Sequence, residues 1–268
     1  MSRKTYPSDL SEAEKLLLAS LIPAAKPGGR HRSVDIWEIV NGIFSILRSG
    51  CAWRMLPHDF PAWQTVYGYF RTWRSAGVWE KMNDALREAV RTQAGREAEP
   101  SAAIIDSQSV KTTETKGARG HDAHKHVTGR KRHILVDVMG LLLTVVVHAA
   151  NIPERAGAKL LLQRAATKGF ARLRLIWADG GYTGAAFQEW VRKLTGWLFE
   201  VVKREEGPKG FTVLPRRWVV ERTLGWLGRS RRLSKEYEQL PETSEAMISA
   251  AMSRLMLKRL AQQPALWL

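Results

Sequence analysis

Apolar residues recur every three or four positions through the first third of the chain, which predicts helices rather than strands. Ser11 and Glu14 have the spacing of a capping box, so the first helix is expected to begin there. Further helices are predicted over about 34–47, from Trp63 onward, and over about 78–92. A connector rich in glycine and proline, residues 48–61, separates the second helix from the third.

The helix that begins near Trp63 turns Gln64, Arg71 and Arg74 away from its apolar stripe. A helix, a short turn and a second helix with exposed polar side chains are typical of a helix-turn-helix-like DNA-binding unit. A plain helical bundle with solvated charges is the alternative. We predict a helical domain over residues 1–94 that binds DNA and could also dimerise, followed by a linker over 95–101.

From residue 102 the pattern changes to short apolar runs that alternate with helical segments, which predicts a mixed α/β domain over 102–268. The expected strands are 102–105, 133–138, 141–149, 173–178 and 197–202, with a hairpin at Met139 and Gly140. The expected helices are 155–168, 185–194, 216–232 and 244–261, and 107–133 is expected to be a polar loop. This order is that of an RNase-H-like domain, in which the first and fourth strands are neighbours.

The chain is strongly basic, with 42 Lys and Arg against 26 Asp and Glu and a net charge of +16. Such an excess favours a polyanionic partner, with nucleic acid ahead of an anionic membrane surface. No apolar run is long enough to span a bilayer. Cys51 is the only cysteine, so neither an intrachain disulfide nor a cysteine-based zinc site can form. We expect a cytoplasmic protein.

Three acidic residues stand out against this background: Asp106 and Asp179 each follow an apolar strand, and Glu221 lies in an arginine-rich helical segment. In the predicted sheet the two aspartates lie at adjacent strand ends, where open α/β sheets place their sites. Carboxylates that converge can hold two Mg²⁺ or Mn²⁺ ions for phosphodiester chemistry, with Asp106 bridging both. Each residue also has a structural reading, as a cap, a turn aspartate or a partner of a nearby arginine.

Basic residues flank this acidic set and are candidate DNA contacts, although a solvated surface loop is the alternative for 107–133. The candidates are Lys111, Lys125, Arg130, Lys131, Arg132, Arg217, Arg222 and Arg229. Trp218 and Trp226 could stack on an unpaired base. His121, His124, His126 and His133 invite a zinc reading, which the lack of cysteine and of helical register disfavours.

Several multi-residue segments resemble DDE transposases of the bacterial insertion-sequence-five type over nearly the whole chain. They are 51–57, 63–67, 73–74, 105–111, 129–133, 178–182 and 216–227. Two positions depart from that group's signature around the third carboxylate: Leu214 stands where a tyrosine is expected and Gly228 where a basic residue is expected. Glu154 before Arg155 also replaces an expected aspartate.

The resemblance implies an RNase-H-like catalytic domain with Asp106, Asp179 and Glu221 as its metal-binding triad. It also implies a bacterial enzyme of the nucleoid that cleaves DNA at terminal inverted repeats and joins the ends to target DNA, as a homodimer on double-stranded DNA. A nuclease or resolvase on the same fold, and a domesticated DNA-binding protein that no longer cuts, remain open as alternatives.

Overall fold

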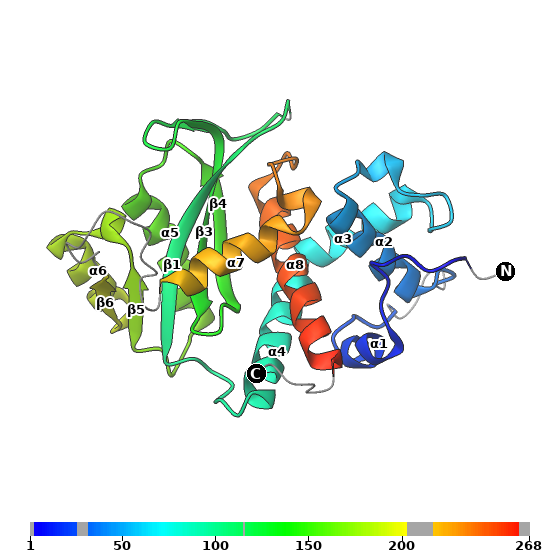
Figure 1. The fold of residues 1–268 in the computed structure, drawn as a ribbon, viewed down its shortest axis with the longest axis horizontal. Helices are drawn as coiled ribbons and strands as arrows, with labels where there is room; N and C mark the ends of the chain where they lie inside the picture. The colour runs from blue at the N-terminus through cyan, green and yellow to red at the C-terminus, as the bar shows by residue number, and fades with distance from the viewer. Residues whose placement is uncertain (1–2, 26–31, 115, 203–216, 263–268) are drawn as a thin grey trace, which may run out of the picture.

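The computed structural model describes residues 3–25, 32–114, 116–202 and 217–262. A mixed β-sheet and its helices form one side of the molecule, and the N-terminal helices form the other (Figure 1). Helix α7, Trp218–Gly228, runs across the sheet toward the helical side, and α8, Pro241–Ala261, lies among the N-terminal helices. The last part of the chain therefore joins the two sides.

The N-terminal helices are α1 (Glu12–Ala19), α2 (Ile36–Ser49), α3 (Trp63–Ser75) and α4 (Val78–Gln93), with a 3₁₀ turn, η1 (Trp53–Met55), between α2 and α3. The capping box is confirmed, because the Ser11 hydroxyl accepts from the Glu14 backbone N–H and the Glu14 carboxylate accepts from that of Ser11. Gly50 ends α2 with a φ of 76°, a left-handed conformation that suits glycine. The predicted helices therefore form close to their expected bounds.

The sheet consists of β1 (Ala102–Lys111), β2 (Gly120–Asp122), β3 (Val127–Asp137), β4 (Leu142–Ala149), β5 (Leu175–Ala178) and β6 (Leu198–Val201). Its order is β2-β3-β1-β5-β6, and β4 also pairs with β3. Strand β1 is antiparallel to β3 and parallel to β5, so the predicted neighbours, the first strand and the one at 173–178, do lie side by side. The fold is a mixed α/β, RNase-H-like sheet preceded by helices.

The prediction of a polar loop over 107–133 is wrong for most of that segment. Strand β1 continues to Lys111, and β3 begins at Val127, with Asp106 opposite Ile134 and Val110 opposite Arg130. Backbone hydrogen bonds between β1 and β3 continue along the whole length of both strands. They hold polar segments in strand conformation even though these segments lack the apolar alternation that predicts a strand. Asp106 therefore lies in the middle of a strand rather than at its end.

Arg130, Lys131 and Arg132 are buried in β3 rather than exposed in the expected loop, and their role as DNA contacts stays a prediction. Arg130 donates to the carbonyls of Ala118, Glu238 and Gln239, and Arg132 donates to those of Leu233 and Lys235. These guanidinium groups satisfy backbone carbonyls that would otherwise be buried without a partner. They anchor the segment that precedes α8 to the sheet.

Helices cover both faces of the sheet. The remaining elements are α5 (Glu154–Lys168), α6 (Ala185–Thr195) and two 3₁₀ turns, η2 (Gly180–Tyr182) and η3 (Arg231–Leu233). On one face, Ala103 and Ile105 of β1 share a core with residues of α5 and α6. On the other, Ile104 of β1 belongs to a core that includes α7, α8 and all the N-terminal helices. Alternate residues of β1 thus reach opposite cores, as strand geometry requires.

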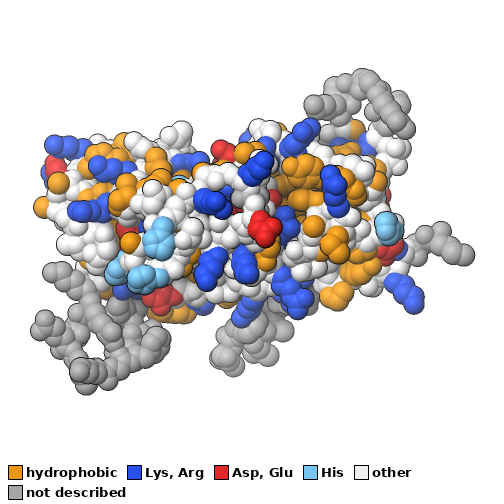
Figure 2. Space-filling model, turned by 90° about the horizontal axis from the view of Figure 1, so that it is seen from above, with side chains coloured by type: hydrophobic (Ala, Val, Ile, Leu, Met, Phe, Trp, Pro, Cys, Tyr) orange, Lys and Arg blue, Asp and Glu red, His pale blue; other side chains and the backbone are white. Residues whose placement is uncertain are grey.

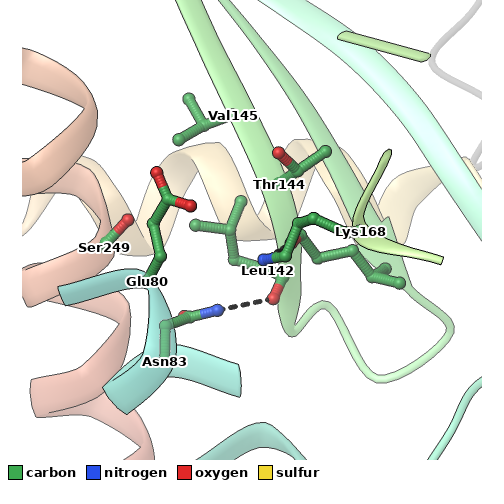
Figure 3. A pocket seen from close by; sticks show the side chains of 8 residues that line it. Glu80, Asn83, Leu142, Thr144, Val145, Lys168 and Ser249 are labelled. Atoms are coloured by element: carbon green, nitrogen blue, oxygen red, sulfur yellow. Dashed lines mark hydrogen bonds between the residues drawn. The ribbon is translucent and has the colours of Figure 1, made fainter. Parts of the chain in front are cut away.

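The second core contains residues of both the N-terminal helices and the sheet. The parts of the chain before and after the predicted linker therefore pack against each other. Figure 3 shows the contact between α4 and β4, where Asn83 Nδ2 donates to the Leu142 carbonyl at 2.9 Å. Arg74 of α3 donates to Thr243 Oγ1 of α8 at 2.5 Å. The division of the chain into a DNA-binding domain and a catalytic domain stays a prediction about function.

Candidate active site

Asp106 lies in the central strand β1 with a largely buried side chain. Its Oδ1 accepts a hydrogen bond of 2.7 Å from the Ser107 backbone N–H. Burial raises the pKa of the Asp106 carboxyl to about 6, and the negative charge of Asp179 contributes in the same direction. The Asp106 carboxylate is desolvated and forms no ion pair with any of the described residues. A cation bound beside it would therefore stabilise its charged form.

Asp179 follows β5, directly beside β1, and so comes close to Asp106. Its Oδ1 accepts from the Gly181 backbone N–H at 2.9 Å and thereby caps η2. The turn-capping reading of this aspartate is therefore correct, but it occupies only one carboxylate oxygen. The other, Oδ2, lies 3.7 Å from Arg217 Nη2.

Arg217 links the second and third carboxylates. Its Nη2 also lies 3.6 Å from Glu221 Oε1, one turn along α7, so a single guanidinium stands between Asp179 and Glu221. The charge of Arg217 also acts on Asp106. The fold thus gathers Asp106, Asp179 and Glu221 around one cation, although they are far apart in sequence.

These three side chains offer the hard oxygen donors that Mg²⁺ and Mn²⁺ prefer. Within the described ranges, no three His, Cys, Asp or Glu side chains are already close enough to hold a metal ion. Arg217 occupies the space between two of the carboxylates, so a bound ion would have to displace its guanidinium or shift it toward the substrate. The donor set fits a divalent ion, and the spacing in this conformation does not.

A polar network lies beside Asp106, and its hub is Glu154 at the start of α5. The Glu154 carboxylate accepts from Ser107 Oγ at 2.7 Å, and lies 3.2 Å from Lys125 Nζ, 3.3 Å from Lys131 Nζ and 3.1 Å from His133 Nε2. Burial alone would raise the pKa of Glu154, but its hydrogen bonds to His133 and Ser107 lower it well below the usual range. The sequence did not indicate this hub, because its partners come from three separate strands and loops.

His133 and His148 form a buried pair behind Glu154. Their rings stack with centroids 5.0 Å apart, and His133 Nδ1 lies 2.9 Å from His148 Nε2. Burial lowers the pKa of both rings, that of His148 to about 4, so both are neutral at physiological pH. Gly157 of α5 faces the pair, and a β-carbon there would overlap both rings. Glycine at this position lets α5 approach the network closely.

Replacing Gly157 with alanine is expected to lower the free energy of unfolding by about 1–3 kcal/mol, because the added methyl overpacks a buried contact. Gly68→Ala is the matched control, since it lies within α3 and a β-carbon there meets nothing within 4 Å. The free energy of unfolding of the control should rise by about 0.5–1 kcal/mol, because alanine loses less conformational entropy on folding than glycine does. Equal gains for both variants in urea unfolding would contradict the close approach of α5.

The other candidate DNA contacts divide by exposure. Lys111, Arg229, Gln64 and Arg71 are exposed. Arg74 is half-buried and used by Thr243, as described above. The remaining candidates contact the site or α7: Lys125 donates to Ser107 and Glu154, and Arg222 lies between the rings of Trp218 and Trp226. Base stacking by these tryptophans and all DNA contacts stay predictions.

The fold and site together define an RNase-H-like domain with one acidic residue on β1, one directly after the adjacent strand β5 and one on a later helix. The family description "Transposase DDE domain" matches residues 97–256, and "Putative transposase of IS4/5 family" matches residues 10–83. The chain belongs to the DDE transposase family, of the IS4/5 type. It is also similar to the "Insertion element IS402 uncharacterized 16.2 kDa protein" of Burkholderia cepacia, with 29% identity over 102 residues, 35% of this chain and 67% of that protein.

These matches confirm the resemblance to insertion-sequence transposases. The family acts on DNA, and its members generally use divalent metal ions. None of the helices in the described ranges is both long and apolar enough to cross a bilayer.

Proposed function

We propose that this protein is a DNA transposase that cuts phosphodiester bonds at the inverted-repeat ends of an insertion sequence and joins the freed 3′-hydroxyls to target DNA. The observation that carries the proposal is the grouping of Asp106, Asp179 and Glu221 around Arg217. In a chain of net charge +16, a cluster of acidic groups within a basic surface is suited to metal-assisted chemistry on a polyanion.

Asp106, Asp179 and Glu221 would hold two Mg²⁺ or Mn²⁺ ions, which activate an attacking oxygen and stabilise the leaving one when bound. Asp106 is central because its strand lies between the other elements and its carboxyl forms no ion pair within the described part of the chain, although the charges of Lys125 and Arg217 reach it. Half-buried Arg217 would give up its contacts with Asp179 and Glu221 and donate to a phosphate oxygen near the cut.

The network behind Asp106 would fix the geometry of the site. Glu154 bonds to Ser107, and the Ser107 backbone N–H bonds to Asp106, so the hub restrains the strand that carries the first carboxylate. Lys125 is exposed beside the same hub and lies close enough to act on the Asp106 carboxyl, so it could also meet a DNA phosphate. Exposed Gln64 and Arg71 of α3 would contact the element's ends. Pairing two ends requires two protomers, so we propose a homodimer on DNA.

A cleavage and joining assay on DNA with the element's terminal repeats tests this function. The wild-type chain should produce 3′-end nicks and joined molecules with Mg²⁺, and neither in EDTA. The Asp106→Ala variant should produce neither under any condition. Cutting without joined products would identify a nuclease or resolvase instead, and binding without any cutting would identify a DNA-binding protein that has lost its enzymatic role.

A further inference from the structure

A cavity of about 1330 Å³ lies between α2, α4, α7 and α8. Its apolar lining includes Phe44, Leu227 and Met252. Its cationic lining comprises Arg48, Arg222, Arg229, Arg254, Lys258 and Arg259, and no Asp or Glu is among the described residues that line it. A cavity whose charged lining residues are all positive is complementary to an anionic partner.

Two of these cations lie on the same indole ring. The guanidinium carbons of Arg222, in α7, and Arg259, in α8, are each 4.5 Å from the centroid of the Trp226 ring. Stacking on an aromatic ring holds each guanidinium, and N–H groups at the edge of the stacked plane can still donate to a partner. The side chains are therefore fixed in place before any ligand binds.

Neither Arg222 nor Arg259 forms an ion pair with a carboxylate among the described residues; Arg222 donates only to the Met139 carbonyl, at 3.1 Å. By contrast, Arg254 in the same cavity pairs with Glu14 at 2.7 Å. Two partly buried cations this close repel each other, so an anion bound beside them would be stabilising. The carboxylate whose charge reaches both, Asp137, is already paired with Arg91.

We propose that the Arg222–Trp226–Arg259 stack, together with Lys258 and Arg229, binds phosphates of the DNA backbone next to the active site. The proposal rests on the function proposed above and adds a contact surface from α8 to it. Arg222 follows Glu221 directly, and the step along α7 from Arg222 to Arg229 is about 10 Å, the length of about three nucleotides of one strand. The surface would therefore hold phosphates close to the one that is cut.

The face of the molecule seen from above carries many Lys and Arg side chains and few acidic ones over its middle (Figure 2). Exposed Lys258 and Arg229 would meet phosphates at the rim of the cavity, and half-buried Arg259 would meet one further in. A continuous run of cations from the active site to α8 would extend the DNA path well beyond the triad.

The test is the affinity of the full-length chain for labelled terminal-repeat DNA in EDTA, measured by fluorescence anisotropy over a range of salt concentrations. Arg259→Gln and Lys258→Gln are each expected to weaken binding about tenfold and to reduce the slope of log affinity against log salt by about one. Arg192→Gln and Lys193→Gln, exposed cations of α6, are matched controls for the loss of one positive charge and should change affinity by no more than about twofold.

If wild-type protein binds the DNA and both cavity variants keep its affinity and salt slope, the phosphate site is overturned while the proposed function stands. Equal losses in the α6 controls would also overturn it, because the effect would then be one of net charge. If wild-type protein does not bind terminal-repeat DNA at all, the proposed function itself fails. Should Arg259→Gln unfold in a thermal melt, the exposed Lys258→Gln variant decides the outcome.

Discussion

Asp179→Asn and Glu221→Gln are each expected to lower the rate of DNA cleavage in Mg²⁺ by about a thousandfold, because each would remove a charged oxygen ligand of the proposed metal site, worth several kcal/mol in the transition state. DNA binding in EDTA should be unchanged or slightly tighter, since each change removes a negative charge that repels phosphate. Single-turnover cleavage and anisotropy on the same DNA measure the two effects separately.

Glu189→Gln is the matched control for these variants. Glu189 is a carboxylate of α6 whose partners are Arg192 and Lys193, outside the active site. Its removal should leave cleavage within about twofold of the wild-type rate. If Glu189→Gln and Glu221→Gln reduced cleavage equally, the assignment of Glu221 to the site would be wrong.

Asp106→Asn is expected to make the metal-free protein more stable at pH 8, by up to about 3 kcal/mol. The pKa of Asp106 rises from 3.8 to about 6 on folding, because of burial and of the charge of Asp179, with Lys125 and Arg217 opposing. The folded state therefore holds a proton that the unfolded chain has lost, so wild-type stability falls as pH rises between these values. Urea unfolding in EDTA at pH 4 and pH 8 measures the change, and the variant's advantage should be present only at the higher pH.

Asp122→Asn provides a control of opposite sign. Asp122 is also buried, yet hydrogen bonds from Ser109 and the Lys125 backbone, with Lys131 beside it, outweigh that burial and lower its pKa to about 2. Its carboxylate stabilises the fold above pH 4 and loses that contribution as pH falls toward 2, so the variant should be about 2 kcal/mol less stable at pH 8. Destabilisation by both replacements at pH 8 would contradict the raised pKa of Asp106.

Local sequence patterns predicted the elements whose cause is local. The capping box at Ser11 and Glu14, the hairpin at Met139 and Gly140, and the start of α3 at Trp63 each depend on residues within one or two turns. The adjacency of β1 and β5 followed from the order of the elements. The position of Asp106 near Asp179 could therefore be predicted from the sequence.

The features that the sequence missed depend on partners distant in the chain. Arg130 and Arg132 were predicted to contact DNA because the sequence around them does not reveal their partners. Those partners are backbone carbonyls of residues 233–239, more than 100 positions away in the chain. The sequence around Glu154 did not indicate its contacts with Ser107 and His133. Arg259 lies in a helix with mixed composition, and only the fold brings it onto Trp226. Buried charges of this kind can be identified only once their partners are placed.

The most direct test of the acidic site is Mn²⁺ binding to the complex of the protein with terminal-repeat DNA, followed by electron paramagnetic resonance. The wild-type complex should bind Mn²⁺ beyond what the DNA alone binds, and Asp106→Asn and Asp179→Asn should each abolish that excess while the complex still forms. The same excess of bound Mn²⁺ in a variant with Asp106, Asp179 and Glu221 all replaced would contradict the assignment of these carboxylates as the metal site.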